Sequence, residues 1–168
     1  MISRLGWMAY ALAALVIAAD QASKYWIMTV VALPERATMA VAGPLQFTRI
    51  WNRGVSFGLF QAEHGLVRWA LVAFSVIVAA VLIGWTRKTD RPGLAMGLGL
   101  IIGGAVGNAI DRVRYGAVID FVDVTQIGFP WIFNVADAAI NVGVVLLLLD
   151  SLRRDPASPA TVRSDRAA

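Results

Sequence analysis

The chain has no cysteine among its 168 residues, and its one histidine is His64. Without cysteine there is no disulfide framework and no thiolate metal site, and one imidazole is too few for a zinc site. The segment Gly54-Val55-Ser56-Phe57-Gly58 matches the nucleophile-elbow pattern in its letters only. That pattern needs a strand-turn-helix context and a histidine base, and the chain offers neither. We therefore expect no metal, no cofactor and no serine-hydrolase chemistry.

Charge is scarce wherever the chain is most apolar. Apolar residues make up 58% of the sequence and the mean hydropathy is +0.68, whereas soluble domains have roughly 45–50% apolar residues. The net charge is +4 and the pI about 10.1. In a soluble protein this balance could indicate nucleic-acid binding, but here the basic residues flank apolar runs. We expect a membrane protein with lipids as neighbours and no nucleic acid as partner.

Four apolar runs are long enough to cross a bilayer, which takes about 20 helical residues. We expect spans at about residues 5–28, 66–85, 94–114 and 131–150. These spans predict an all-α membrane protein, a four-transmembrane-helix bundle formed by a single domain over residues 1–152. The segment 153–168, with its prolines and scattered charge, is expected to be a disordered cytoplasmic tail. No internal repeat is visible, which weakens the case for a transporter built from inverted halves.

The basic residues also predict the orientation of the spans. They precede the first span, join the second to the third and follow the fourth: Arg4, Arg87, Lys88, Arg91, Arg153, Arg154, Arg163 and Arg166. The positive-inside rule places these segments, and with them both termini, in the cytoplasm. A cleavable signal peptide over residues 1–19 is an alternative, but it would leave three spans with a reversed charge bias.

The segments on the opposite side contain strand-like stretches. Thr38 to Val41 and Leu45 to Trp51 flank a Gly43-Pro44 turn, and Val118 to Val122 is a further short strand candidate. We expect a small periplasmic β element resting on the membrane surface.

Polar residues inside the spans gather at one depth, near the periplasmic face. Helical spacing places them on three stripes: Asp20, Ser23 and Lys24; Asn108, Asp111, Arg112 and Tyr115; Asn134, Asp137 and Asn141. An aspartate at the centre of a span costs roughly 2.5–3.5 kcal/mol on insertion scales, so such residues are functional candidates. The stripes can converge only on each other or on a water-filled cleft.

Each polar group also has a structural interpretation. Asp20 with Lys24, and Asp111 with Arg112, could be ion pairs. Asn134 could cap the fourth helix with Asp137 in its first turn. Asp120 could be a solvated loop residue.

The remaining catalytic chemistry is that of paired carboxyl groups. Two aspartates a few ångström apart share a proton, so that one is a base for water while the other donates to a carbonyl oxygen. Asp137 is the acid expected in such a pair, and Arg112 and Arg114 are expected to keep Asp111 ionised. From position alone, both Asp120 and Asp123 remain possible partners for Asp137.

Five segments in chain order resemble the motifs of the lipoprotein signal peptidase (signal peptidase II) family. They are Asp20-Gln21 with Lys24, the segment 52–58, the segment 103–112, the segment 116–123 and the segment 133–140. Ala138 departs from the pattern, which often has serine there. The resemblance implies that Asp120 and Asp137 are the catalytic pair. It implies supporting or substrate-binding roles for Asp20, Lys24, Asn52, Asn108, Asp111, Arg112 and Asn134.

The resemblance further implies an aspartic endopeptidase of the bacterial inner membrane, with its active site near the periplasmic face. Its partners would be diacylated prolipoproteins, cut on the N-terminal side of the lipidated cysteine, and we expect a monomer. Two other classes stay open: a small ion or proton transporter, which would need polar residues reaching the inner face, and a non-catalytic membrane assembly protein, which would not need two acids.

Overall fold

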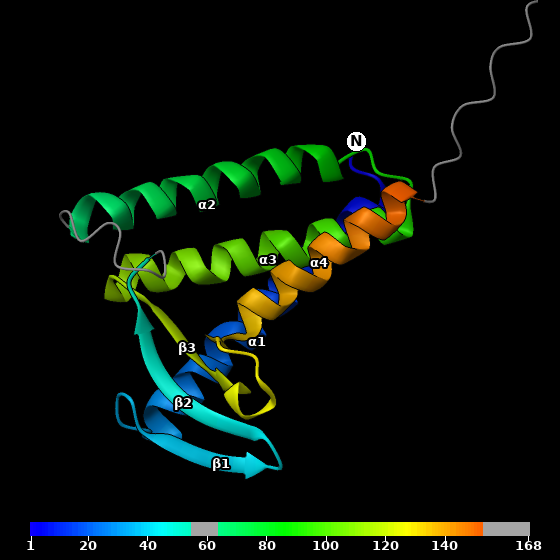
Figure 1. Cartoon of the computed structure of the whole chain (residues 1–168). Helices are drawn as coiled ribbons and strands as arrows, with labels where there is room; N and C mark the ends of the chain where they lie inside the picture. The colour runs from blue at the N-terminus through cyan, green and yellow to red at the C-terminus, as the bar shows by residue number, and fades with distance from the viewer. Residues whose placement is uncertain (55–63, 153–168) are drawn as a thin grey trace, which may run out of the picture.

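The structure, a computed structural model, describes residues 1–54 and 64–152, which form four long helices and one small sheet (Figure 1). The helices are α1 Arg4–Tyr25, continued by the π-helical segment η1 Trp26–Val30, then α2 His64–Thr86, α3 Pro92–Tyr115 and α4 Val135–Leu152. All four are long and apolar enough to cross a membrane, as the sequence predicts. The elbow-like Ser56 and the tail 153–168 lie outside the described residues.

Helix α3 is the centre of the bundle. In its most apolar stretch of 18 residues, 72% is buried inside the protein. The corresponding share is 11% for α2 and 17% for α4. Its glycines permit this central position, because a Cβ atom on Gly99 would lie 2.7 Å from the carbonyl oxygen of Ala9 in α1. A Cβ on Gly104 would overlap the carbonyl oxygen of Ala136 in α4. Small residues therefore let both α1 and α4 approach α3 at backbone distance.

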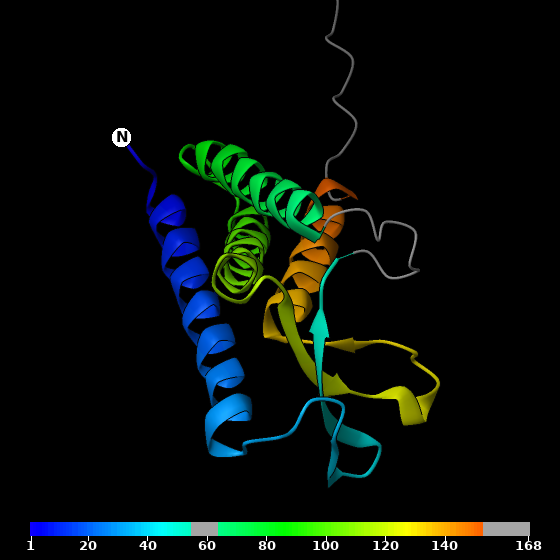
Figure 2. The same cartoon turned by 90° about the vertical axis from the view of Figure 1, so that its left-hand side faces the viewer.

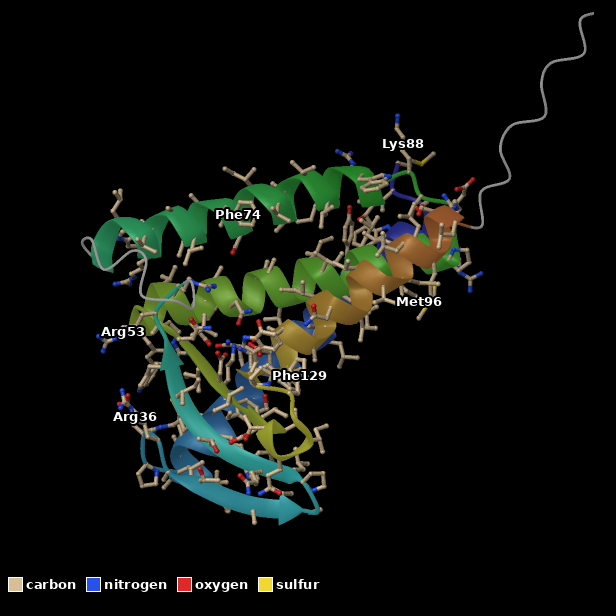
Figure 3. All side chains as sticks on the ribbon, viewed as in Figure 1. Arg36, Arg53, Phe74, Lys88, Met96 and Phe129 are labelled. Carbon is tan, nitrogen blue, oxygen red and sulfur yellow. The ribbon has the colours of Figure 1, made fainter. Side chains whose placement is uncertain are left out.

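The outer faces of the helices are apolar and uncovered. On α2, Phe74 (labelled in Figure 3), Ile77 and Val81 are exposed. A contiguous apolar face of this size is unfavourable in water and suits a hydrocarbon surrounding.

The sheet has the order β1-β2-β3-β4 with antiparallel pairs throughout. Its strands are β1 Thr38–Ala42, β2 Leu45–Asn52, β3 Val118–Asp123 and β4 Ile132–Phe133. The predicted strands are confirmed, and Gly43, with a φ of 54°, forms the turn between β1 and β2. The pairing of β2 with β3 joins two strands that lie far apart in the sequence.

The fourth span was expected from residue 131, and this boundary is wrong. The helix begins at Val135 because Phe133 pairs with Val122 of β3 and the chain is extended there. Asn134 then caps the helix, so its backbone lies outside the helical turns.

A small apolar core joins the sheet to the C-terminal end of the first helix, where η1 continues α1. Ile27 and Leu33 pack against Ile119 and Phe121 of β3, and all four are buried. The core holds β3 next to the C-terminal end of α3. Gly116 follows that end with a φ of 79° and turns the chain from helix into strand. The position of Asp120 follows from this attachment.

The N-terminus and the end of α4 lie at one end of the molecule, and the sheet lies at the other (Figures 1 and 2). The Ser3 hydroxyl donates to the carbonyl oxygen of Thr89 at 2.7 Å, which fixes the N-terminus to the α2–α3 connection. Arg91 forms an ion pair with Asp150 near the end of α4. Both described chain ends therefore share one side with Lys88, whereas Arg36 and Arg53 lie at the sheet (Figure 3).

Candidate active site

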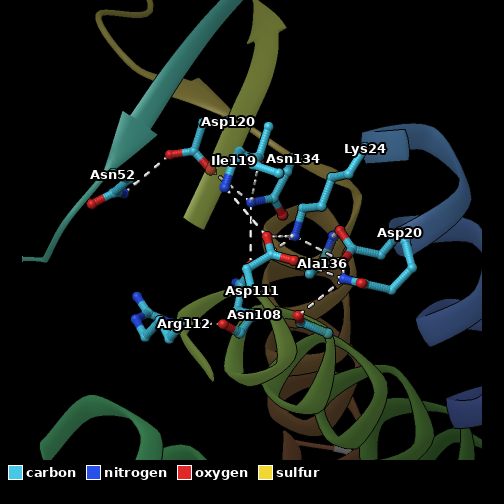
Figure 4. A network of polar contacts seen from close by, with 12 residues as sticks. Asp20, Lys24, Asn52, Asn108, Asp111, Arg112, Ile119, Asp120, Asn134 and Ala136 are labelled. Carbon is cyan, nitrogen blue, oxygen red and sulfur yellow. Dashed lines mark hydrogen bonds and ion pairs between the residues drawn. The ribbon is translucent and has the colours of Figure 1, made fainter. Parts of the chain in front are cut away.

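Polar residues from each of the three stripes meet where α1, α3, α4 and the sheet join (Figure 4). The Ser23 hydroxyl donates only to the backbone carbonyl oxygen of Asp20, and the side chains of Tyr115 and Asn141 form no hydrogen bond with the other residues of this described group. The structure brings together every site residue that the sequence indicates: Asp20, Lys24, Asn52, Asn108, Asp111, Arg112, Asn134, Asp120 and Asp137. They divide into a buried ion cluster on one side and a pair of carboxyl groups facing a pocket on the other.

The ion cluster consists of Lys24 between two aspartates. Its Nζ atom lies 2.8 Å from Asp20 and 2.7 Å from Asp111, and all three side chains are at most 2% exposed. Removing one partner of a buried ion pair leaves an uncompensated charge, at a cost of about 3–5 kcal/mol. Replacement of any one of the three should therefore disturb the contact between α1 and α3.

The expected pairing of Asp111 with Arg112 is wrong. Asp111 faces Lys24 on α1, and its carboxylate also accepts a hydrogen bond from the backbone N–H of Ile119 at 3.2 Å. Arg112 is one position further along the helix and so points about 100° away. In the described part of the chain no carboxylate lies within 4 Å of its guanidinium, which donates to the carbonyl oxygen of Asn108 at 3.4 Å.

The other oxygen of Asp20 reaches the start of α4. It accepts the backbone N–H of Ala136 at 3.0 Å, so a residue of α1 satisfies a free N–H in the first turn of another helix. Gln21, which the sequence motif contains without an assigned role, adds hydrogen bonds from its amide to Asp111 at 2.8 Å and to the Gly107 carbonyl oxygen at 3.3 Å. The sequence signal that could have indicated this role of Gln21 is a polar side chain next to Asp20 within an apolar run.

Asp120 projects from β3 and is 1% exposed. It accepts hydrogen bonds from the side-chain amides of Asn134 at 2.6 Å and Asn52 at 3.0 Å. Burial and the nearby charge of Asp137 raise the pKa of Asp120 to about 7, and the two amide hydrogen bonds only partly oppose this. A carboxyl group with this pKa is protonated in a large fraction of molecules near neutral pH.

Asp137 lies in the first turn of α4 and shares a capping box with Asn134. The backbone N–H of Asp137 donates to the Asn134 amide oxygen at 2.8 Å, and the Asn134 N–H donates to the Asp137 carboxylate at 3.3 Å. The predicted cap is therefore confirmed. The Asn108 amide also donates to Asp137, at 2.7 Å. Asp137 thus accepts two hydrogen bonds at the N-terminal end of α4.

Asn108 and Asn134 connect the two carboxyl groups. The Asn134 amide nitrogen donates to Asp120 and lies 3.2 Å from the Asn108 oxygen, whose own amide nitrogen donates to Asp137. The same Asn108 oxygen accepts from Lys24 at 3.3 Å. Since Lys24 can only donate, it fixes which end of the Asn108 amide faces Asp137.

Asp120, Asp137 and Asn52 line one pocket of about 770 Å³. The rest of the lining is largely apolar and comes from the β3–β4 connection and from α4. Phe129, on that connection, lies beside the first turns of α4 (Figure 3). The pocket therefore combines an acidic end with an apolar wall.

Asp123, the other possible partner of Asp137, does not line this pocket. Its carboxylate accepts hydrogen bonds from the Thr48 hydroxyl at 2.6 Å and from the backbone and hydroxyl of Thr125 at 2.9 and 2.7 Å. Burial raises its pKa, but these hydrogen bonds outweigh burial and hold the pKa below its ordinary value. Asp123 thus fixes the β3–β4 connection. Within residues 1–54 and 64–152, no group of three or more potential metal ligands is present.

A sequence profile described as Signal peptidase (SPase) II matches residues 12–153. The chain belongs to the signal peptidase II family. It is 50% identical over 151 residues to a lipoprotein signal peptidase of Caulobacter vibrioides, covering 89% of each chain. It is 51% identical over 146 residues to one of Methylorubrum extorquens, covering 86% of this chain and 85% of the relative.

Solved structures agree with the family assignment. A bacterial membrane enzyme determined by the in meso method at 1.9 Å resolution superposes with a TM-score of 0.77 and 27% identity, covering 88% of this chain and 94% of that one. A second bacterial membrane enzyme, determined at 2.3 Å, gives a TM-score of 0.75 and 26% identity, covering 90% and 94%. The fold that the chain shares with these membrane enzymes thus extends over 88–90% of its length.

Proposed function

We propose that this chain is a membrane aspartic endopeptidase that removes the signal peptide from diacylglyceryl-modified prolipoproteins, cutting on the N-terminal side of the lipidated cysteine. The observation that supports this activity is the placement of Asp120 and Asp137 in one pocket of a signal peptidase II family member. The pocket's apolar wall suits a substrate that carries acyl chains.

In the reaction, Asp120 begins neutral and Asp137 begins ionised. Water attacks the carbonyl carbon of the scissile peptide bond and gives one proton to Asp137, while Asp120 donates its proton to the carbonyl oxygen. The tetrahedral intermediate then returns a proton to Asp120 as the C–N bond breaks, and the leaving amine takes the proton from Asp137. The products are a signal peptide with a new carboxyl end and a lipoprotein with a free amino group on its lipidated cysteine.

The supporting residues hold this pair in place and transfer no proton themselves. Asp20, Lys24 and Asp111 fix α1, α3 and β3 relative to the first turn of α4. Asn108 and Asn134 orient the carboxyl groups, and Asn52 binds the free oxygen of Asp120. Because these side chains are already in place, little reorganisation is needed when substrate binds.

The enzyme is placed in the bacterial inner membrane with both termini in the cytoplasm and the pocket near the periplasmic face. The shared location of both described chain ends with Arg87, Lys88 and Arg91 supports this orientation. Reporter fusions after Asp150 and near Gln61 should give cytoplasmic and periplasmic signals respectively. A periplasmic signal from the fusion after Asp150 would contradict four spans in this orientation.

The catalytic pair is tested by replacing each aspartate with its nearly isosteric amide. Asp120→Asn and Asp137→Asn should each abolish cleavage of a diacylated lipobox peptide while the purified protein keeps its melting temperature. The double variant should be no worse than either single variant, because the pair acts as a unit. Asp123→Asn is the matched control on the same strand and should retain turnover. Turnover by Asp120→Asn together with an inactive Asp123→Asn would refute the assignment.

A further inference from the structure

Asn141 places an exposed side-chain amide on α4 at the edge of the pocket that holds Asp120 and Asp137. It lies four residues after Asp137 on the same helical face, about 6 Å further from the sheet along the helix axis. Its neighbours on the exposed face of α4 are apolar: Val142, Val145 and Leu149. One polar group therefore stands at the point where the pocket wall becomes a surface suited to hydrocarbon.

The amide of Asn141 differs from the other asparagines of the site. Asn108 and Asn134 are each held by several hydrogen bonds, whereas the Asn141 side chain forms none with the residues that the structure describes. A polar group without a partner in an apolar medium costs several kcal/mol, so polar side chains in spans usually have a binding role.

The pocket continues from its acidic end along this part of α4. Ile127, Phe129 and Trp131 of the β3–β4 connection form the facing apolar wall. The connection is fixed by the hydrogen bonds of Thr125 to Asp123, so the slot between it and α4 exists before anything binds. An apolar substrate group that follows this wall away from Asp120 and Asp137 passes Asn141.

We propose that Asn141 is a specificity-determining residue whose amide N–H binds a carbonyl oxygen of the lipidated substrate at this exit. This inference rests on the proposed function. Two parts of the substrate offer such an acceptor: the glyceryl ester groups, and the last turn of the signal helix, whose final carbonyl groups have no partner within the helix. Binding a carbonyl oxygen here satisfies two polar groups that would otherwise face hydrocarbon.

The test compares Asn141→Leu, Asn141→Gln and the control Val145→Leu, one turn further along the same exposed face. Full-length purified proteins cleave two lipobox peptides that differ only at the cysteine, which carries either diacylglyceryl or an ether-linked dialkylglyceryl group. Loss of one hydrogen bond predicts that Asn141→Leu raises KM about five- to tenfold with little change in kcat. Asn141→Gln keeps the amide and should stay within about twofold of the parent, as should Val145→Leu.

The two substrates identify the acceptor. An effect of Asn141→Leu on the diacyl peptide alone assigns the amide to an ester carbonyl, and an equal effect on both peptides assigns it to a peptide carbonyl. A KM within about twofold of the parent for both peptides overturns the inference, given the hydrogen-bond magnitude expected. The inference is also overturned if Asn141→Leu converts a dimer into a monomer and leaves KM unchanged, because the amide would then bind a second copy of the chain.

Failure of this inference is distinguishable from failure of the proposed function. Binding of the same two peptides is measured in an Asp120→Asn background, with and without Asn141→Leu. If the parent protein cleaves neither peptide, the proposed function falls, while a five- to tenfold weaker binding in the Asn141→Leu protein still supports the carbonyl site. Unchanged binding refutes the carbonyl site whatever the activity.

Discussion

Lys24 on α1 and Asp111 on α3 form an ion pair of 2.7 Å whose side chains are 2% and 1% exposed. The same ammonium group pairs with Asp20, and Asp20 in turn accepts the N–H of Ala136 in α4. One lysine thereby connects the three helices that carry or position both carboxyl groups of the pocket.

We expect Lys24→Met to be strongly destabilising, because it leaves two buried carboxylates without a cation, at a cost of about 3–5 kcal/mol. The measurement is thermal unfolding of the purified protein in detergent. Arg91→Ala is the control, since its pair with Asp150 is partly exposed and is worth about 0–1 kcal/mol. Adding Asp20→Asn and Asp111→Asn to Lys24→Met should restore part of the lost stability. Equal melting temperatures for Lys24→Met and Arg91→Ala would show that the cluster does not hold the helices.

Arg112→Ala should leave stability nearly unchanged. The guanidinium makes one long hydrogen bond and no ion pair within the described residues, so its removal should cost at most about 1 kcal/mol. Thermal unfolding beside Lys24→Met checks this expectation. A melting temperature as low as that of Lys24→Met would mean that Arg112 is the structural partner of a buried acid after all.

Activity should fall as the pH rises through about 7. The folded-state pKa of Asp120 is about 7, above its ordinary value, so Asp120 loses its catalytic proton over this range. The same shift makes a stability contribution that is fully present below the unfolded pKa of about 3.9 and is lost as the pH rises through 7. A pH profile of kcat/KM tests the first statement, and melting curves between pH 4 and pH 8 test the second. An alkaline limit well above pH 9 would contradict a neutral Asp120 in the reaction.

Removing the Asn52 amide should move that alkaline limit upward. The amide donates to Asp120 at 3.0 Å and favours the ionised carboxylate, so Asn52→Ala raises the pKa of Asp120 further. A shift of about half a unit to one unit is expected from the loss of one hydrogen bond. Gln46→Ala, at the other end of β2 opposite Asp123, is the control and should leave the profile in place. A downward shift for Asn52→Ala would mean that the amide stabilises the neutral acid.

A methyl group on Gly104 should damage both stability and activity. Its Cβ would overlap the carbonyl oxygen of Ala136, the residue before Asp137, so α4 must move away from α3. Overpacking of this kind costs about 1–3 kcal/mol. Gly84→Ala is the control, because a Cβ atom there meets no atom within 4 Å. Thermal unfolding and turnover of the two variants should differ clearly, and equal values would contradict the close approach.

Local patterns in the sequence predicted the helices, three of the strands and the capping box at Asn134. They did not choose between Asp120 and Asp123, because both lie on one short strand. The choice depends on which face of β3 meets α4. Ile119 and Phe121 pack into the core with Ile27, so Asp120, which lies between them, faces the other side. Pairing between distant strands is set by tertiary packing, which a single sequence does not display.

The sequence also predicted the wrong partner for Asp111, which pairs with Lys24 and not with Arg112. The cause is similar. Neighbours in the sequence suggested Arg112, but adjacent helical residues point in different directions and cannot face each other. The true partner comes from another helix. The start of α4 was misjudged because Ile132 and Phe133 are apolar enough for a span, yet they pair with β3.

The hydrogen bond between Asp20 and Ala136 joins residues that are 116 positions apart. Asp20 lies in the first of the four helices and Ala136 in the last. A chain synthesised from its N-terminus therefore carries Asp20 and Lys24 long before Asp111 and Ala136 emerge from the ribosome. Until the last helix arrives, Asp20 and Lys24 can pair within the first helix, but the second carboxylate oxygen of Asp20 lacks the Ala136 N–H that it accepts in the folded protein. A protein truncated before α4 thus lacks more than Asp137: one buried carboxylate oxygen of its first helix is left without the N–H donor that it has in the complete fold.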